Sequence, residues 1–231
     1  MSDSKDSFPE SEKAGVYRAI YQRRDMRHFL PDPLDEALIE KLLSAAHAAP
    51  SVGYMQPWRI LRIRARATRE ALHGLVEKER QTTAKALGKR SDEFMQLKVQ
   101  GILDCGEVWV VSLMEARERH LFGRRTMPQM DLASASCAIQ NLWLAARAEG
   151  VGVGWVSLFE PEDLRSLLGM PDGADPIAIL CIGQVPEFYD QPMLAKEGWA
   201  QRGDLNDYVM LDAWDEDKAI RAQQQWETTD E

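Results

Sequence analysis

The chain has few of the residues on which several common kinds of active site depend. Its four histidines have neither the spacing of a metal site nor a cysteine neighbour: His28, His47, His73 and His120. It also has no Walker lysine, no Gly-x-Ser-x-Gly elbow and no His-Glu-x-x-His pair. The glycines from Gly150 to Gly154 follow a predicted helix and enter a predicted strand, the reverse of a dinucleotide-binding loop. We therefore expect no metal catalysis and no nucleotide-binding loop of these kinds.

Excess positive charge and long apolar runs are also missing. The net charge is -9, which argues against a general nucleic-acid or acidic-membrane partner, because both need a clustered basic surface. No apolar run approaches the ~18 residues of a membrane span, and Met1 to Lys13 lacks a signal-peptide core. The three cysteines lie in apolar runs, as expected of buried free thiols in a reducing compartment: Cys105, Cys137 and Cys181. These features predict a cytoplasmic protein without a nucleic-acid or membrane partner.

What the chain does contain is enough apolar sequence for a substantial core, 45% of 231 residues. Helical spacing predicts helices over 16–24 with Val16 and Ile20 apolar, 35–46 with Asp35 as N-cap, 129–149 with Gly150 at the C-terminal cap, and 161–168. A further, charged helical stretch is predicted from position 67 to about 88. In the long helix the apolar stripe is Leu132, Ala135, Ile139, Leu142, Trp143 and Ala146. Strands are predicted over 58–63, 108–114, 151–157 and 176–185. Because helices and strands do not alternate regularly, we expect an α+β fold.

The sequence predicts a single large domain with two different ends. Residues 1–14 read as a flexible N-terminal segment, 15–210 as the domain, and 211–231 as an acidic tail that is frayed or lies over a partner. Within the domain, residues 81–100 are charged and contain Gly88, which suggests a lid. The alternative for this stretch is a solvated helical excursion.

Arg23-Arg24-Asp25-Met26-Arg27 places three guanidinium groups beside one carboxylate. The planar fork of arginine suits phosphate and carbonyl oxygens, although a surface salt-bridge network is the alternative. Asp25 is then either a counter-ion or a group held there to accept a proton. The neighbouring arginines should favour its charged form, and burial beneath a closed lid would oppose them.

Several separated pieces of the chain together resemble the nitroreductase-like flavoproteins. They are Arg-Arg-x-x-Arg, the Pro-Ser-x-x-x-x-Gln-Pro-Trp turn that starts at Pro50, the long helix that ends at Gly150, the strand Gly154 to Ser157, and Arg202. Members of that family are intertwined α+β homodimers with a mixed, mostly antiparallel sheet, and they bind FMN at the subunit interface. The resemblance implies the same architecture and cofactor here.

The resemblance also implies which residues bind FMN. The arginines near position 25 correspond to the group that holds the phosphate and the N1/O2 edge of the ring, with Arg202 as a second phosphate ligand. The turn after Pro50 reaches the flavin from the opposite subunit, and the end of the strand at Ser157 lies near N5 and O4. The full expected set is Arg23, Arg24, Asp25, Met26, Arg27, Pro50, Ser51, Val52, Gly53, Gln56, Trp155, Val156, Ser157, Leu158 and Arg202.

Two departures from the common pattern resemble one branch of the family, the 5,6-dimethylbenzimidazole synthases. Asp25 follows Arg24 where Arg-x-Ser is usual, and Tyr54 stands where Asn is common. The segments 128–132 and 140–147 add to this likeness. That branch consumes reduced FMN with O2, makes the lower ligand of vitamin B12 and releases erythrose 4-phosphate. The likeness implies that Asp25 is a general base and that Ser157 positions an oxygen species or an early fragment.

A closed lid would leave no room for a nicotinamide, so we expect a separate flavin reductase to supply reduced FMN. Two alternatives remain open. One is an NAD(P)H-dependent nitro- or quinone reductase that recycles FMN and uses Asp25 only in a salt bridge. The other is a flavin-storage or interaction module that binds FMN without affecting its oxidation.

Overall fold

The computed structural model describes residues 6–98 and 101–227, and divides into two compact units, Met1–Phe188 and Tyr189–Glu231. This division falls earlier than the predicted start of the tail at position 211. At the other end, residues 10–14, which were expected to be flexible, already belong to the first helix. Residues 1–5 of the predicted flexible segment lie outside the described ranges.

A four-stranded antiparallel sheet forms the centre of the first unit, in the order β1-β2-β4-β3. Its strands are β1 (Trp58–Arg62), β2 (Glu107–Leu113), β3 (Gly152–Val156) and β4 (Asp175–Gly183). Parallel pairing within the described residues is limited to one isolated bridge, between Asp25 and Val153. The predicted α+β class is confirmed, and the mixed character of the sheet rests on that bridge alone.

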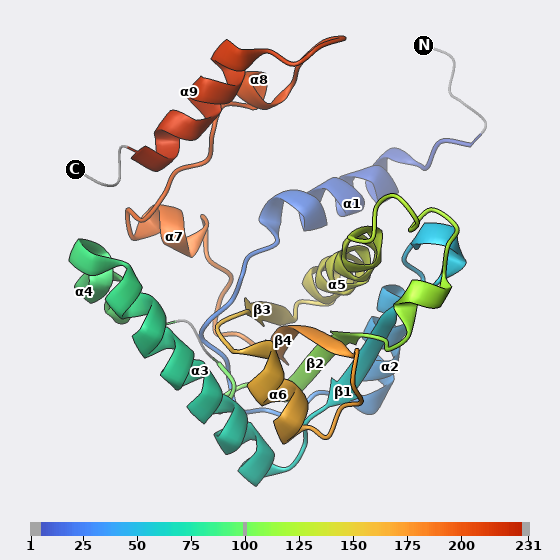
Figure 1. Cartoon of the computed structure of the whole chain (residues 1–231), viewed down its shortest axis with the longest axis vertical. Helices are drawn as coiled ribbons and strands as arrows, with labels where there is room; N and C mark the ends of the chain where they lie inside the picture. The colour runs from blue at the N-terminus through green and yellow to red at the C-terminus, as the bar shows by residue number, and fades with distance from the viewer. Residues whose placement is uncertain (1–5, 99–100, 228–231) are drawn as a thin grey trace. The chain divides into compact units, whose positions relative to one another are not determined.

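Helices cover both faces of this sheet (Figure 1). The first unit contains α1 (Glu10–Gln22), α2 (Glu36–His47), α3 (Arg66–Ala86), α4 (Ser91–Gln96), α5 (Met130–Ala148) and α6 (Pro161–Leu167), with 3-10 turns η1 (Val52–Tyr54), η2 (Gly88–Arg90) and η3 (Arg117–Arg119). The core joins α2 and α5 to one face through residues such as Leu42, Ile139 and Trp109. Across the described ranges, no helix is both long and apolar enough to cross a membrane.

The predicted helix ends follow from their capping residues. Asp35 caps α2 by accepting a hydrogen bond from the backbone N–H of Ala37 at 3.3 Å, and α2 ends at His47, before Pro50. Gly150 follows α5 with φ +75°, the left-handed conformation that glycine adopts without a Cβ penalty. Both caps are confirmed.

The predicted burial was wrong for one cysteine. Cys137 is exposed, whereas Cys105 and Cys181 are buried as expected. Among the apolar helical residues, Leu132 on α5 is 44% exposed, and Val16 and Ile20 on α1 are 50% and 41% exposed. Helical periodicity identifies an apolar stripe, but α1 and α5 carry apolar residues beyond the stripe that meets the core.

The predicted lid, residues 81–100, is partly a helical hairpin. Residues 81–86 are the last turns of α3, and α4 follows after η2. Arg80 on α3 donates hydrogen bonds to the backbone oxygens of Met95 at 2.5 Å and Leu97 at 3.0 Å, which ties the two helices together. Residues 99 and 100 lie outside the described ranges.

The second unit contains α7 (Met193–Lys196), α8 (Leu205–Tyr208) and α9 (Glu216–Glu227). Asp204 caps α8 through the backbone N–H of Asn206 at 2.9 Å, and an ion pair between Arg221 and Asp207 at 2.8 Å joins α9 to α8. The predicted acidic tail is thus helical over most of its described length, and residues 228–231 lie outside the description.

Candidate functional site

The segment 23–27 runs along the free edge of β3. Helix α1 ends at Gln22, and the backbone N–H of Met26 then donates a hydrogen bond to the oxygen of Val153 at 2.9 Å. Two glycines of β3 permit this approach, because a Cβ on Gly154 would overlap the backbone oxygen of Met26, and a Cβ on Gly152 would lie 3.1 Å from Met26 Cγ. The glycine-rich run therefore makes room for the segment that carries Asp25.

Asp25 and Arg27 bind the two backbone groups of one residue, Trp155. Asp25 Oδ1 accepts the backbone N–H of Trp155 at 2.8 Å, and Arg27 Nη1 donates to the backbone oxygen of Trp155 at 3.1 Å. Arg27 Nη2 also forms an ion pair with Asp25 Oδ2. The two side chains thus satisfy the edge of β3 where a neighbouring strand would otherwise pair.

The carboxyl group of Asp25 is held in an unusual electrostatic environment. Burial raises its pKa above the ordinary value of 3.8, although Arg27, the N–H of Trp155 and Arg23 each act to lower it. The sequence left this balance open, and in the structure the effect of burial is the larger one. The side chain nevertheless exposes 38% of its area, so another molecule can reach it.

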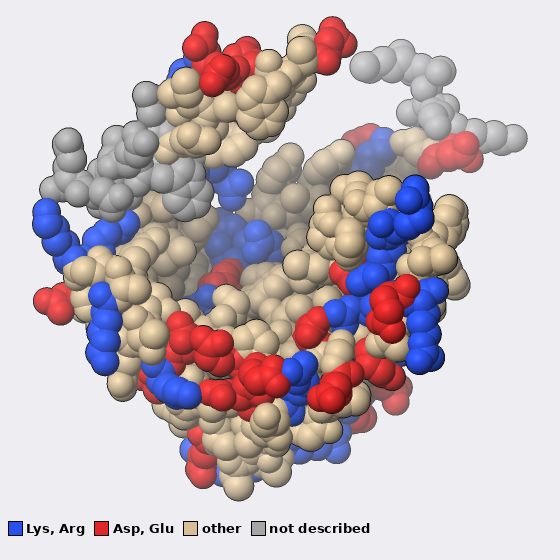
Figure 2. Space-filling view, in the orientation of Figure 1, with Lys and Arg blue, Asp and Glu red and all other residues tan. Residues whose placement is uncertain are grey.

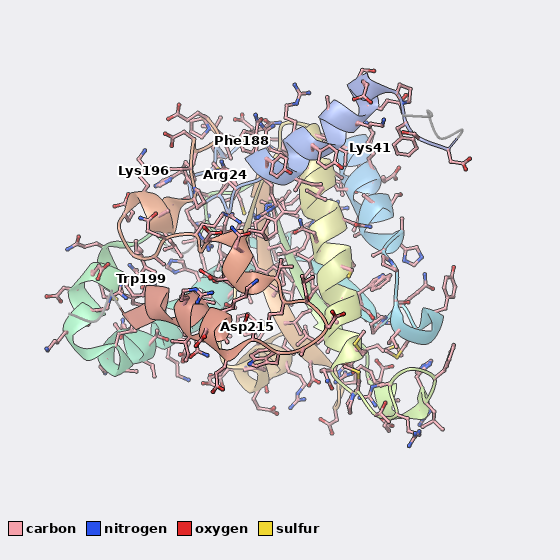
Figure 3. All side chains as sticks on the ribbon, turned by 90° about the horizontal axis from the view of Figure 1, so that it is seen from above. Arg24, Lys41, Phe188, Lys196, Trp199 and Asp215 are labelled. Carbon is pink, nitrogen blue, oxygen red and sulfur yellow. The ribbon has the colours of Figure 1, made fainter. Side chains whose placement is uncertain are left out.

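Trp143 on α5 connects the two arginines that precede Asp25. The guanidinium carbon of Arg23 lies 4.7 Å from the centre of the indole ring, and the indole N–H donates to the backbone oxygen of Arg24 at 3.1 Å. Arg24, labelled in Figure 3, donates to the backbone oxygen of Tyr21 at 2.8 Å, where α1 ends. The arginine cluster is therefore fixed to both α1 and α5.

After Trp155, the end of strand β3 carries three more residues that were predicted to bind FMN. Val156 is buried, Leu158 is half-buried, and Ser157 is exposed just after the strand. Residues 23–27 and 155–158 thus lie at the same edge of the sheet.

The turn 51–56 is built by local hydrogen bonds and unusual backbone conformations. Ser51 Oγ accepts the backbone N–H of Gln56, and Ser134 Oγ on α5 accepts that of Val52, both at 3.0 Å. Positive φ angles occur at Gly53 (52°) and Gln56 (49°), and also at Tyr54 (54°). Such angles are uncommon for residues other than glycine and are held by the surrounding structure.

A loop before α5 packs against this turn. A Cβ on Gly53 would lie 2.8 Å from the backbone oxygen of Phe122, so the two backbones approach closely. Asp131 at the start of α5 holds the loop through Arg117 at 2.9 Å and Arg124 at 3.1 Å. Basic side chains gather over this loop (Figure 2).

The predicted site residues therefore form two groups within the first unit, and these groups lie apart. The turn contacts α5 at Ser134, and the arginine cluster contacts it at Trp143, about nine residues or roughly 13 Å further along the helix. Arg202 belongs to the second unit and stays a prediction.

The sequence did not single out Trp143, Ser134 or the β3 glycines as parts of the site. Trp143 was assigned to the apolar stripe of α5, and it is indeed 7% exposed. The sequence could have pointed to Trp143 through its indole N–H, because a buried tryptophan normally has a hydrogen-bond acceptor. Ser134 is a buried hydroxyl on the same helix and also needs a partner.

Comparisons with known proteins agree with this architecture. A model described as "Nitroreductase family" matches residues 20–184. The chain is 37% identical to a 5,6-dimethylbenzimidazole synthase of Rhodobacter capsulatus (84% of this chain, 95% of that protein) and 38% identical to one of Rhodospirillum rubrum (84% and 93%). It is 30% identical to an NADH dehydrogenase of Thermus thermophilus (73% and 86%).

Solved structures share the fold at lower identity. Nitroreductase A from Vibrio parahaemolyticus superposes with a TM-score of 0.67 at 16% identity, covering 93% of this chain and 84% of that one. Iodotyrosine deiodinase bound to FMN and 3-iodo-L-tyrosine gives 0.67 at 16% identity, covering 85% and 97%. The chain therefore belongs to the nitroreductase family, in the branch of the 5,6-dimethylbenzimidazole synthases.

Proposed function

We propose that the protein converts reduced FMN and O2 to 5,6-dimethylbenzimidazole and releases erythrose 4-phosphate. The observation that carries this proposal is the placement of Asp25. It is a carboxylate of raised pKa, fixed by the N–H of Trp155 and yet 38% exposed, among the arginines expected to hold the flavin. The likeness to two named synthases supports the same activity.

The residues at the edge of β3 fit FMN by their chemistry. Guanidinium groups of Arg23, Arg24 and Arg27 suit a phosphate and the carbonyl edge of a flavin, and no lysine or metal is needed for either contact. Reduced FMN brings the electrons that O2 accepts. Arg202, Ser51, Val52, Gly53 and Gln56 complete the proposed set, with Pro50 before the turn and Met26 as the buried anchor of the segment.

Asp25 is proposed to accept a proton from the ribityl C1′ of the substrate. A carboxylate with a raised pKa is a stronger base than an ordinary one, and the hydrogen bond from Trp155 fixes its orientation. The exposed hydroxyl of Ser157, at the end of β3, is proposed to position an oxygen species or an early fragment.

The separation of the two groups along α5 supports a homodimer with a shared site. If two copies pair about a two-fold axis perpendicular to α5, between the levels of Ser134 and Trp143, the two helices run antiparallel and the turn of one copy meets the arginine cluster of the other. The unburied apolar side chains of α1 give such a pairing a surface to cover: Val16, Tyr17, Ile20 and Tyr21 are 50%, 55%, 41% and 71% exposed.

The α3–α4 hairpin is proposed to cover the bound flavin. It would exclude water and a nicotinamide, so a separate flavin reductase supplies the reduced FMN. Arg80 hydrogen-bonds α4 to α3 and would hold the two helices of this cover together.

The proposal is tested by reducing FMN without oxygen, adding the protein, admitting air and identifying the products. Loss of the isoalloxazine spectrum, with 5,6-dimethylbenzimidazole and erythrose 4-phosphate formed in equal amounts, is the expected result. Full recovery of oxidised FMN would contradict it. Stoichiometric NADH oxidation by the isolated protein would instead favour the reductase function, to which the likeness to the Thermus NADH dehydrogenase points.

A further inference from the structure

Trp143 contacts the 23–27 segment through its ring face and its N–H, and its ring lies 6.4 Å from that of Trp155 on β3. We propose that Trp143 is a positioning residue, which fixes Arg23 and the backbone before Asp25 so that both meet the flavin in one arrangement. This inference rests on the proposed function, because it assigns Trp143 a part in holding the same substrate.

The first contact restrains a long and flexible side chain. Arg23 follows the last residue of α1, and its guanidinium carbon lies 4.7 Å from the centre of the Trp143 ring. A cation on the face of an indole is attracted to the ring, and more strongly where water is partly excluded. Arg23 is half-buried, so this contact fixes the direction in which its positive charge is presented.

The second contact restrains the backbone directly before the carboxylate. The indole N–H of Trp143 donates to the backbone oxygen of Arg24 at 3.1 Å, and that oxygen belongs to the peptide that links Arg24 to Asp25. Rotation of this peptide would move Asp25 relative to β3. The hydrogen bond opposes such a rotation and acts together with the bond between Trp155 and Asp25.

The third contact joins both restraints to the strand. The rings of Trp143 and Trp155 lie 6.4 Å apart at 41°, and the backbone N–H and oxygen of Trp155 bind Asp25 and Arg27. A buried indole needs an acceptor for its N–H, and Trp143 makes a cation–π contact in addition. Trp143 therefore connects the rigid helix α5 to the side chain of Arg23 and to the backbone before Asp25.

The experiment compares Trp143→Phe and Trp143→Leu with the same changes at Trp109. Trp109 is a matched control, since it is also a buried indole and its N–H is also bonded, to Glu107 at 2.8 Å. Two quantities are measured on proteins shown to be folded: the Kd of FMN from the quenching of its fluorescence, and the titration of the Asp25 carboxyl by carbon NMR.

We expect Trp143→Leu to raise the Kd of FMN about tenfold. Trp143→Phe keeps a ring beneath Arg23 and should raise the Kd about threefold. The Trp109 variants should stay within about twofold of the parent. The Asp25 pKa should rise further in Trp143→Leu, because Arg23, which lowers it, is no longer held nearby. The other charged or titratable neighbours of Asp25, Arg27 and Cys181, are unchanged in these variants.

A folded Trp143→Leu protein with the parental Kd and the parental Asp25 titration would overturn the inference. If that variant does not fold, Trp143→Phe decides by the same two measurements, and values equal to those of Trp109→Phe would overturn it. Failure of the proposed function is a separate result, seen as an absence of FMN binding or of product in the parent protein. The Asp25 titration still tests the role of Trp143 in that case.

Discussion

The segment 23–27 and the turn 51–56 are both irregular stretches attached to α5, yet they are held by different forces. The segment is fixed by charged side chains against a strand edge, with Asp25 and Arg27 on the backbone N–H and oxygen of Trp155. The turn is fixed by neutral hydroxyls, which hold a backbone with positive φ angles. The first arrangement orients a titratable group, and the second fixes the shape of a backbone. Changes of charge should therefore affect the first, and loss of hydroxyl partners the second.

The largest expected effect comes from Asp25→Asn. The amide keeps the size of the side chain but cannot act as the base, so product formation should fall by ~100-fold or more while FMN still binds. Thermal stability should not fall, because burial makes the charged form of Asp25 the less favoured one in the folded state. Asp35→Asn is the control, since Asp35 also accepts a backbone N–H but caps α2. Parental product formation in Asp25→Asn would leave Asp25 with a structural role only.

Gly154→Ala should detach the segment from its strand. The added Cβ would overlap the backbone oxygen of Met26, and a backbone cannot swing away as a flexible side chain can. We expect a loss of about 2 kcal/mol in the free energy of unfolding, measured by urea denaturation. Gly74→Ala on α3 meets no atom within 4 Å and should stabilise the protein slightly. Equal effects of the two changes would contradict the close approach.

The pH dependence of product formation should be set by the charged segment and not by the neutral turn. Asp25 accepts a proton only when ionised, so the rate of product formation should fall about tenfold per pH unit below its pKa. Burial raises that pKa, so the acid limb should lie above the ordinary value of 3.8. The pH profile of kcat/KM for reduced FMN measures it, because this quantity reports the pKa values of the free protein. An acid limb that persists unchanged in the residual activity of Asp25→Asn would assign it to another group.

Ser134→Ala should have the smallest effect, confined to the turn. The change removes the acceptor of the Val52 N–H and leaves that group without its partner, at a cost of about 1 kcal/mol in unfolding free energy. Ser136→Ala is the control, because the hydroxyl of Ser136 bonds only within its own helix, to the oxygen of Leu132 at 2.9 Å. If the two variants unfold at the same urea concentration, the bond to Val52 contributes nothing to stability.

Much of the fold could be predicted because it depends on local sequence. The caps at Asp35 and Gly150 and the period of α5 are properties of neighbouring residues, and the structure confirms them. Burial was less predictable, as Leu132 and Cys137 demonstrate, since it depends on which surfaces meet and not on the period alone.

The site was predictable in its residues but not in its connections. The order of motifs led to Arg23 through Arg27 and to the turn after Pro50, whereas the bond from Trp155 to Asp25 joins residues far apart in the chain. The direction of the Asp25 pKa shift stayed open for the same reason, because burial is a property of the packed structure and opposes the flanking arginines.

Helix α5 carries the turn at one end and the charged segment towards the other, so its length sets the register between two functional regions. Inserting one residue between Ser134 and Trp143 would advance the far end by about 1.5 Å and rotate it by about 100°. Trp143 would then turn away from Arg24, while the turn at Ser134 kept its place. A change of chain length within that stretch of helix would therefore separate the charged segment from the turn.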